Sequence, residues 1–177
     1  MHLNENRLPV RRRIRLPLDQ YDNSHVFSIT ISTHERYEWF ARHTGLTEAL
    51  VGIIRETARE RSAGLFAWCV MPEHLHLVLR DSDVLDFVRL IKGRCTPVAR
   101  RYDRTRRLWQ RSFHDRGVRR EESLISVARY VLNNPVRAGL VADAAAYPWS
   151  GSDAWPQWRL DDWSKIEVEV TNLFGEE

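Results

Sequence analysis

Residues 66–80 read Phe-Ala-Trp-Cys-Val-Met-Pro-Glu-His-Leu-His-Leu-Val-Leu-Arg, and this stretch decides the fold. Its apolar, β-branched and aromatic residues are typical of strands, and Pro72 and Glu73 interrupt them, which predicts a hairpin with a tight turn. Beyond the turn, successive side chains face opposite sides of the strand. His74 and His76 therefore share one side, and three leucines share the other.

Two imidazoles at positions i and i+2 of a strand lie side by side on one surface. Neutral imidazole is the commonest metal ligand in proteins, and a strand holds such a pair rigidly. The same pattern also fits two surface histidines on a half-exposed strand, because a motif match alone is weak evidence. His74 and His76 are thus a candidate metal site whose interpretation depends on the rest of the chain.

The composition is that of one globular domain. The chain has 177 residues, of which 43% are hydrophobic and 29% are charged. It has no apolar run long enough to span a membrane, and its first residues lack the apolar core of a signal peptide, so we expect a cytoplasmic protein. Two cysteines, Cys69 and Cys95, do not suggest a disulfide framework or a zinc cluster.

Positive charge is unevenly distributed, although the net charge is only +3. Residues 1–20 form an arginine-rich arm, residues 89–111 carry nine basic residues and the single acid Asp103, and residues 152–177 form a Trp-rich, acidic tail. Clustered arginine favours a nucleic-acid partner, whereas the alternative is a solvated helix face. The candidate DNA-binding residues are Arg11, Arg12, Arg13, Arg94, Arg100, Arg101, Arg104, Arg106 and Arg107.

Periodicity and capping signals predict an order of strand, helix, hairpin, helix, strand and helix. The expected elements are a strand at 26–33, a helix at 47–61 capped by Thr47, the hairpin, a helix that starts at Ser82 or Asp83 and restarts at Thr96-Pro97, a strand at 112–119, and a helix at 121–134 that Pro135 stops.

This order predicts an α+β fold of the ferredoxin-like, split β-α-β type, with an antiparallel sheet, two helices on one face and an extra C-terminal helix. The first and third strands are then central. Alternation in the first strand places Ser28, Thr30 and Ser32 on the same face as the two histidines. The predicted sheet therefore has a polar, histidine-bearing face opposite its two covering helices.

The last predicted helix carries Tyr130 and Asn134 at positions i and i+4, so both project from one flank of it. Taken alone, the tyrosine fits an amphipathic edge residue, and the asparagine before Pro135 fits a cap or turn residue.

Four segments together resemble one family. His74-Leu-His76 resembles the signature of HUH single-strand nucleases. The chain has MPEHLHLV (71–78), LWQ (108–110), YVLNNPVRAGLV (130–141) and YPWS (147–150). These segments resemble those of REP-associated tyrosine transposases and occur in the same order. Those proteins are relatives of the IS200-like single-tyrosine transposases. The resemblance covers residues 21–150. Two departures are Glu73, where the family commonly has Asn, and Gly151, where Ser is usual.

The resemblance implies a function. It identifies residues 21–151 as an HUH transposase domain that cuts and transfers single-stranded DNA at REP-type hairpins through a 5′-phosphotyrosine. Tyr130 corresponds to the nucleophile, and His74, His76 and Asn134 correspond to the ligands of Mg²⁺ or Mn²⁺. The partners would be DNA hairpins in the nucleoid, with no membrane or small-molecule substrate. The branch suggests a monomer, although related insertion-sequence enzymes work as dimers.

Two other functions fit parts of the pattern. A hairpin-binding protein descended from such transposases would bind DNA without cutting it, and a covalent-adduct assay separates it from the enzyme. An RNA-binding ferredoxin-like module would need aromatic residues on the open face of its sheet. The predicted face offers serine, threonine and histidine instead.

Overall fold

The computed structural model describes residues 25–118 and 124–160. The strands are β1 (Phe27–Ser32), β2 (Gly64–Met71), β3 (His74–Arg80), β4 (His114–Gly117) and β5 (Ser150–Gly151). The helices are α1 (Trp39–Arg42), α2 (Thr44–Glu60), α3 (Val84–Ala99), α4 (Leu124–Leu132) and α5 (Asn134–Arg137), and short 3₁₀ helices are η2 (His34–Arg36), η3 (Ala144–Ala146) and η4 (Pro156–Leu160).

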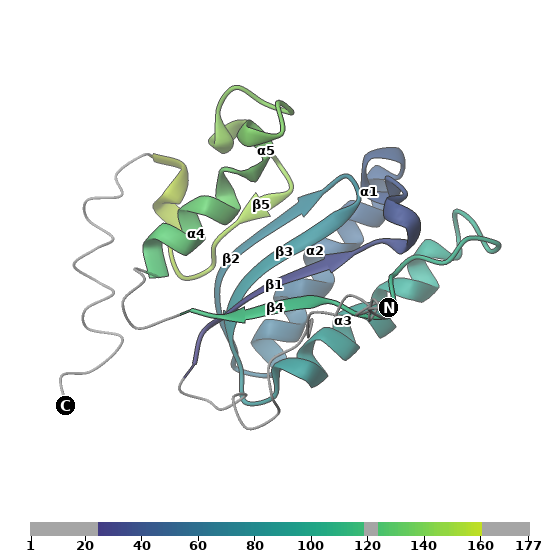
Figure 1. Cartoon of the computed structure of the whole chain (residues 1–177), viewed down its shortest axis with the longest axis horizontal. Helices are drawn as coiled ribbons and strands as arrows, with labels where there is room; N and C mark the ends of the chain where they lie inside the picture. Colours follow the sequence, from purple (N-terminus) through teal and green to yellow (C-terminus); the bar gives the residue numbers. More distant parts are fainter. Residues whose placement is uncertain (1–24, 119–123, 161–177) are drawn as a thin grey trace, which may run out of the picture.

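The strands form one antiparallel sheet in the order β4-β1-β3-β2-β5. The helices α2 and α3 connect β1 to β2 and β3 to β4 and cover one face, whereas α4 packs against the other (Figure 1). This arrangement confirms the predicted α+β, ferredoxin-like fold with its extra helix. β1 and β3 are internal strands of the sheet, as expected.

The alternation of side chains along the strands divides the interior into two cores. Phe27, Ile29 and Ile31 of β1 and the leucines of β3 lie with the inner faces of α2 and α3. Alternate residues of β2 and β3 lie with α4 and with Trp155 and Trp158. The part of the predicted tail that the structure describes therefore packs into the second core.

The helix predicted from Thr47 starts earlier. α2 begins at Thr44, and Thr47 lies inside its first turns, so the predicted cap is wrong. Its hydroxyl is fully buried and donates a hydrogen bond of 2.8 Å to the carbonyl oxygen of Phe40 in α1. A threonine near a helix start can bond either to the helix or to the preceding chain, and burial here selects the second.

The predicted break at Thr96-Pro97 is also wrong, because α3 continues through Pro97 to Ala99. The proline ring faces the carbonyl of the residue four positions earlier, and that residue is Gly93, whose backbone adjusts readily. Cys95 and Ala99 are buried in the core, so their packing favours continuing the helix. The predicted cap at Asp83 is confirmed, since its carboxylate accepts a hydrogen bond from the Asp86 amide.

Beyond α4 the chain is more ordered than its sequence pattern indicates. The predicted helix end at Asn134 is wrong, because α4 ends at Leu132. Pro135 stops no helix but stands in the first turn of the short α5, where a missing amide proton costs nothing. Ser150 and Gly151 then pair with Cys69 and Trp68 of β2 and add the fifth strand. Two residues are too few to show a strand period in a sequence, so β5 was not predicted.

Cys69 and Cys95 are free thiols that lie in the two different cores, Cys69 on the α4 side and Cys95 beneath α2 and α3. In the described ranges, no helix combines the length and the apolar character needed to cross a membrane.

Candidate active site

His74 and His76 stand on the sheet face that α4 covers. Their partners on β2 are Met71 and Cys69, and both of these belong to the core on the α4 side. The two imidazole rings are perpendicular, and their Nε2 atoms lie 2.8 Å apart. The pair predicted from the strand alternation is therefore brought together at one point.

In each imidazole, the Nδ1 atom, on the side of the ring away from the other histidine, lies within hydrogen-bond distance of a neighbouring side chain. Nδ1 of His74 lies 3.0 Å from Oε1 of Glu73, and Nδ1 of His76 lies 3.0 Å from Oγ1 of Thr30, its neighbour on β1. Glu73 is itself paired with the Arg36 guanidinium at 3.3 Å. Such contacts orient the rings of metal-binding histidines.

Burial keeps both rings neutral. It lowers the pKa of His76 to about 3, and the neighbouring His74 adds to the effect. Burial also lowers the pKa of His74, although the Glu73 carboxylate opposes that shift. Neutral imidazoles donate lone pairs to a metal without first losing a proton.

The hydrogen bonds also determine where the protons lie. A carboxylate only accepts, so Nδ1–H of His74 donates to Glu73 and its Nε2 carries a lone pair. His76 then donates from Nε2 to His74 across the 2.8 Å contact. For both Nε2 atoms to bind a metal, the His76 proton must move to Nδ1, where the Thr30 hydroxyl accepts it.

These two nitrogens fit a divalent metal with open coordination positions. Within the described residues, no cluster of three or more His, Cys, Asp and Glu side chains could hold a metal. A third protein ligand would therefore be of another type, and Asn134 is the residue expected from the sequence.

Tyr130 lies in the last turn of α4, which packs on β2 and β3, whereas Asn134 is the first residue of α5 and not, as predicted, part of the same helix. Tyr130 is 52% exposed, and the Arg137 guanidinium carbon lies 4.3 Å from the centre of its ring. The amide of Asn134 donates to the carbonyl oxygens of Tyr130 (3.2 Å) and Val131 (3.1 Å). α4 lies on the sheet face that carries the histidines, but in the described part of the chain no hydrogen bond joins Tyr130 or Asn134 to them.

The predicted DNA-binding arginines separate into three groups. Arg11, Arg12 and Arg13 lie outside the described residues. Arg94 is bound internally, at 2.6 Å from Glu60 and 3.0 Å from Thr57. Of the others, Arg101 is exposed at the end of α3, and four border a groove beside that helix, namely Arg100, Arg104, Arg106 and Arg107.

Sequence reasoning placed Thr30 on the histidine face but gave it no role, and it noted Glu73 only as a departure. The adjacency of a carboxylate to the first histidine was the available signal for Glu73. No sequence signal pointed to Arg36, because it lies 37 positions before Glu73.

Three comparisons with known proteins bear on the family. Residues 23–134 match the family described as IS200-like transposase. No curated protein matches the chain. The fold is similar to that of a solved REP-associated tyrosine transposase bound to a REP hairpin, with 23% identity over 73% of this chain and 78% of that chain and a TM-score of 0.60. A putative transposase from Deinococcus radiodurans R1 is also similar, with 22% identity over 61% of this chain and 88% of that chain and a TM-score of 0.46. Because the matched segment spans most of the chain and includes both histidines and Tyr130, this protein belongs to the IS200-like transposase family.

Proposed function

We propose that this transposase cuts and rejoins single-stranded DNA beside a REP-type hairpin, through a covalent bond between Tyr130 and a 5′-phosphate, with a divalent metal at His74 and His76. The observation that carries the proposal is the convergence of two neutral imidazoles, each oriented from behind, on the face that the tyrosine-bearing helix covers. A surface histidine pair has no need of such supports.

The bound metal would supply charge neutralisation at a non-bridging phosphate oxygen. Mg²⁺ prefers oxygen ligands and Mn²⁺ accepts imidazole more readily, so either ion suits this site. Asn134 remains a proposed third ligand. Its Nδ2 already donates to the end of α4, so its carbonyl oxygen is the atom available to a metal.

The chain's own part in the chemistry is nucleophilic. The Tyr130 oxygen forms a bond to phosphorus, the bond from phosphorus to the 3′-oxygen breaks, and the proton lost by the phenol ends on that 3′-oxygen. Arg137 stacks on the tyrosine ring, so its positive charge lies beside the negative charge that develops. The reverse reaction rejoins strands without an external energy source, since one phosphodiester replaces another.

The remaining arginines are proposed to hold the DNA, in the nucleoid of the cell. Arg11, Arg12, Arg13, Arg100, Arg101, Arg104, Arg106 and Arg107 would contribute phosphate contacts, whereas Arg94 is already paired with Glu60. We further propose that the protein works as a monomer, as the resemblance to the REP-associated branch suggests.

The test is incubation with a labelled hairpin oligonucleotide and Mn²⁺, followed by a denaturing gel. We expect a covalent adduct with the wild type and none with Tyr130→Phe, which keeps the ring and loses the nucleophilic oxygen. Tyr102→Phe is the matched control, because Tyr102 is also exposed, at 45%. An adduct from Tyr130→Phe would overturn the assignment.

The metal ligands are tested in the same assay. His74→Ala and His76→Ala should each lower cleavage by roughly 100-fold or more while hairpin affinity changes by less than about threefold, because the phosphate contacts remain. Cleavage at the wild-type rate by either variant would remove that histidine from the site.

A further inference from the structure

The sheet face that carries the histidine pair is covered unevenly. In the part of the chain that the structure describes, α4 contacts mainly β2 and β3, and β4 forms the opposite edge of the sheet (Figure 1). The side chains of β1 and β4 on this face are polar and half-buried or exposed, namely Ser28, Thr30, Ser32, His114 and Arg116. The candidate active site therefore has α4 on one side and a polar strip of sheet, made by these five residues, on the other.

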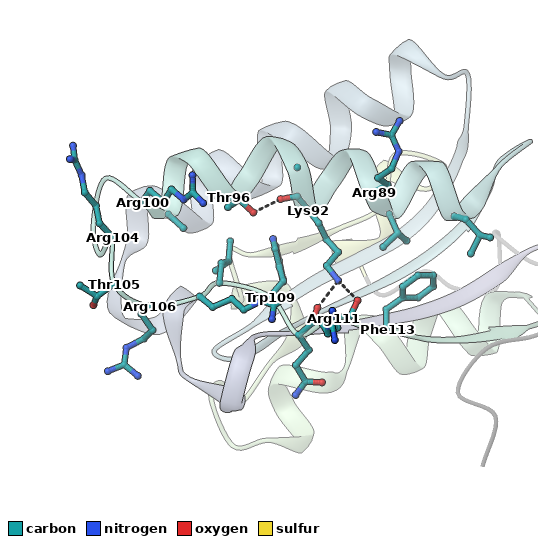
Figure 2. Close-up of a pocket in the computed structure, with 17 residues that line it drawn as sticks. Arg89, Lys92, Thr96, Arg100, Arg104, Thr105, Arg106, Trp109, Arg111 and Phe113 are labelled. Atoms are coloured by element: carbon teal, nitrogen blue, oxygen red, sulfur yellow. Dashed lines mark hydrogen bonds between the residues drawn. The ribbon is translucent and has the colours of Figure 1, made fainter. Parts of the chain in front are cut away.

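His114 faces this polar strip. Phe113, the residue before it, belongs to the core beneath α2 and α3 and lies beside α3 (Figure 2), so alternation turns His114 to the other face. His114 is also paired with Thr30 in the sheet. The Thr30 hydroxyl lies 3.0 Å from Nδ1 of His76, so Thr30 is on the histidine face. Two observations thus place His114 on the same face as the histidine pair.

His114, Thr30 and His76 form a row across the neighbouring strands β4, β1 and β3. Adjacent strands lie about 4.8 Å apart, so the Cα atoms at the two ends of the row are about 10 Å apart. In agreement with this separation, His114 is not part of any cluster of three metal-binding side chains among the described residues. A phosphodiester held near His76 has room to lie above Thr30, between the two imidazole rings.

The His114 ring is available to a substrate. It is exposed, and no hydrogen bond or ion pair with another described residue engages it. Imidazole both gives and takes a proton near neutral pH, whereas the hydroxyls of serine and threonine are weak acids and arginine keeps its proton. Of the five residues of the polar strip, His114 is therefore the one suited to general acid–base catalysis.

The proposed reaction needs a proton donor on this side of the histidine pair. Displacement at phosphorus places the attacking and the leaving oxygen on opposite sides of the phosphorus atom. The attacking oxygen belongs to Tyr130, on the helix that lies over β2 and β3. The leaving 3′-oxygen then points away from α4, toward β1 and β4. It would depart as a strongly basic alkoxide unless a proton reached it as the bond breaks.

We propose, on the basis of the proposed function, that His114 is a catalytic residue that protonates the leaving 3′-oxygen during cleavage. The Tyr130 oxygen bonds to phosphorus while the phenol proton passes to water. The bond from phosphorus to the 3′-oxygen breaks, and the imidazolium of His114 gives its proton to that oxygen and becomes neutral. His114 then regains a proton from water, so the net change is one proton moved from the phenol to the 3′-oxygen.

The same residue serves the rejoining reaction. Neutral His114 takes the proton of the 3′-hydroxyl as that oxygen attacks the phosphotyrosine, and the departing Tyr130 oxygen takes a proton from water. Because cleavage leaves His114 neutral, the residue ends that step in the form that rejoining requires.

The test replaces the leaving oxygen with sulfur. The linkage that the wild type cuts is first mapped from its covalent adduct, and the hairpin oligonucleotide is then made with a 3′-bridging phosphorothiolate at that linkage. A thiol is far more acidic than an alcohol, so its thiolate leaves without a proton donor. His114→Gln keeps a polar side chain of similar length but cannot deliver a proton. The matched control is His25→Gln, an exposed imidazole five residues before Thr30, about 16 Å away along the strand direction.

We expect His114→Gln to slow adduct formation by roughly 100-fold or more with the oxygen substrate and by less than about threefold with the sulfur substrate. His25→Gln should stay within about twofold of the wild type with both. The affinities of His114→Gln for Mn²⁺, by electron paramagnetic resonance, and for the hairpin, by fluorescence anisotropy, should also stay within about twofold, because His114 is assigned to neither.

An equal loss with the two substrates would overturn the inference, and so would a wild-type rate of His114→Gln with the oxygen substrate. A loss of Mn²⁺ affinity of roughly tenfold would overturn it as well, because His114 would then act through the metal site. The absence of an adduct from the wild type would contradict the proposed function itself, so the two failures are distinguishable.

Discussion

Glu73 precedes the first histidine and binds it through the side chain, and Arg36 binds Glu73 in turn. Both Glu35 and Arg36 have positive φ angles, 53° and 52°, which few residues other than glycine adopt. Strain of this kind persists where surrounding structure enforces it, often at functional sites. The ion pair between the Arg36 guanidinium and the Glu73 carboxylate is one contact that holds this backbone conformation.

Glu73→Ala should lower the affinity for Mn²⁺ by roughly 10- to 100-fold, because the His74 ring loses the acceptor that fixes its orientation and its proton. Glu73→Gln should lose much less, since an amide oxygen still accepts from Nδ1–H. The measurement is a Mn²⁺ titration followed by electron paramagnetic resonance, with circular dichroism to check folding.

The control is Glu56→Ala, which removes only an exposed contact with Arg59 on α2. Equal Mn²⁺ affinity of Glu73→Ala and the wild type would show that Glu73 does not position His74.

For single residues, the sequence predicts which side chains share a face of the sheet, because strand periodicity determines it. It does not predict the hydrogen-bond partners that depend on the geometry of a turn. Alternation and the predicted strand order placed Thr30 on the face of the two histidines, and the structure pairs it with His76. The direction of the Glu73 side chain depends on the backbone angles of a two-residue turn, and a sequence pattern contains no such angle.

Among the elements, β5 explains why position 151 is a glycine. Gly151 pairs with Trp68 of β2. A Cβ at position 151 would lie 2.7 Å from Cη2 of Trp68 and closer still to Cζ2. The indole therefore occupies the space of a side chain at 151, so that glycine and tryptophan form a matched pair across the two strands.

Gly151→Ser should lower the free energy of unfolding by about 1–3 kcal/mol, because the indole must move out of its packed position. In a Trp68→Leu background the same substitution should cost much less, which makes the pair non-additive. Urea unfolding of the four proteins measures both effects. Additivity within about 0.5 kcal/mol would contradict the proposed steric match.

Element boundaries were predicted less well than element identities. Helix stripes and strand alternation were confirmed because burial follows them directly. The errors at Thr47 and Pro97 arose where a local signal competed with packing, since the buried Thr47, Cys95 and Ala99 bind their helices to the core.

The whole molecule has three layers, with α2 and α3 on one face of the sheet and α4 on the other, and each core contains one cysteine. Burial raises the pKa of each thiol from the ordinary 9.0 to about 12. A raised pKa keeps a thiol protonated, so neither cysteine forms appreciable thiolate in the folded state near pH 8.

Alkylation by iodoacetamide at pH 8 should therefore be at least about 100-fold slower in the native protein than in urea. Cys69 should react before Cys95, because the α4 layer has a 9-residue helix whereas α2 and α3 have 17 and 16 residues and smaller units open at lower free energy. Mass spectrometry of the two cysteine peptides over time measures the order. Equal rates would mean that both layers open as one unit.

The hairpin of β2 and β3 also limits how this protein can evolve. Only Pro72 and Glu73 join the strands, and the side chains of β3 alternate between the two cores. Deleting or inserting one residue in this segment would invert the strand, sending both imidazoles beneath α2 and α3 and three leucines to the other face. We therefore expect this hairpin to tolerate substitutions but not insertions or deletions of a single residue. The loop at 100–107 lies outside every strand, so a change in its length would turn no side chain of the sheet to the other face.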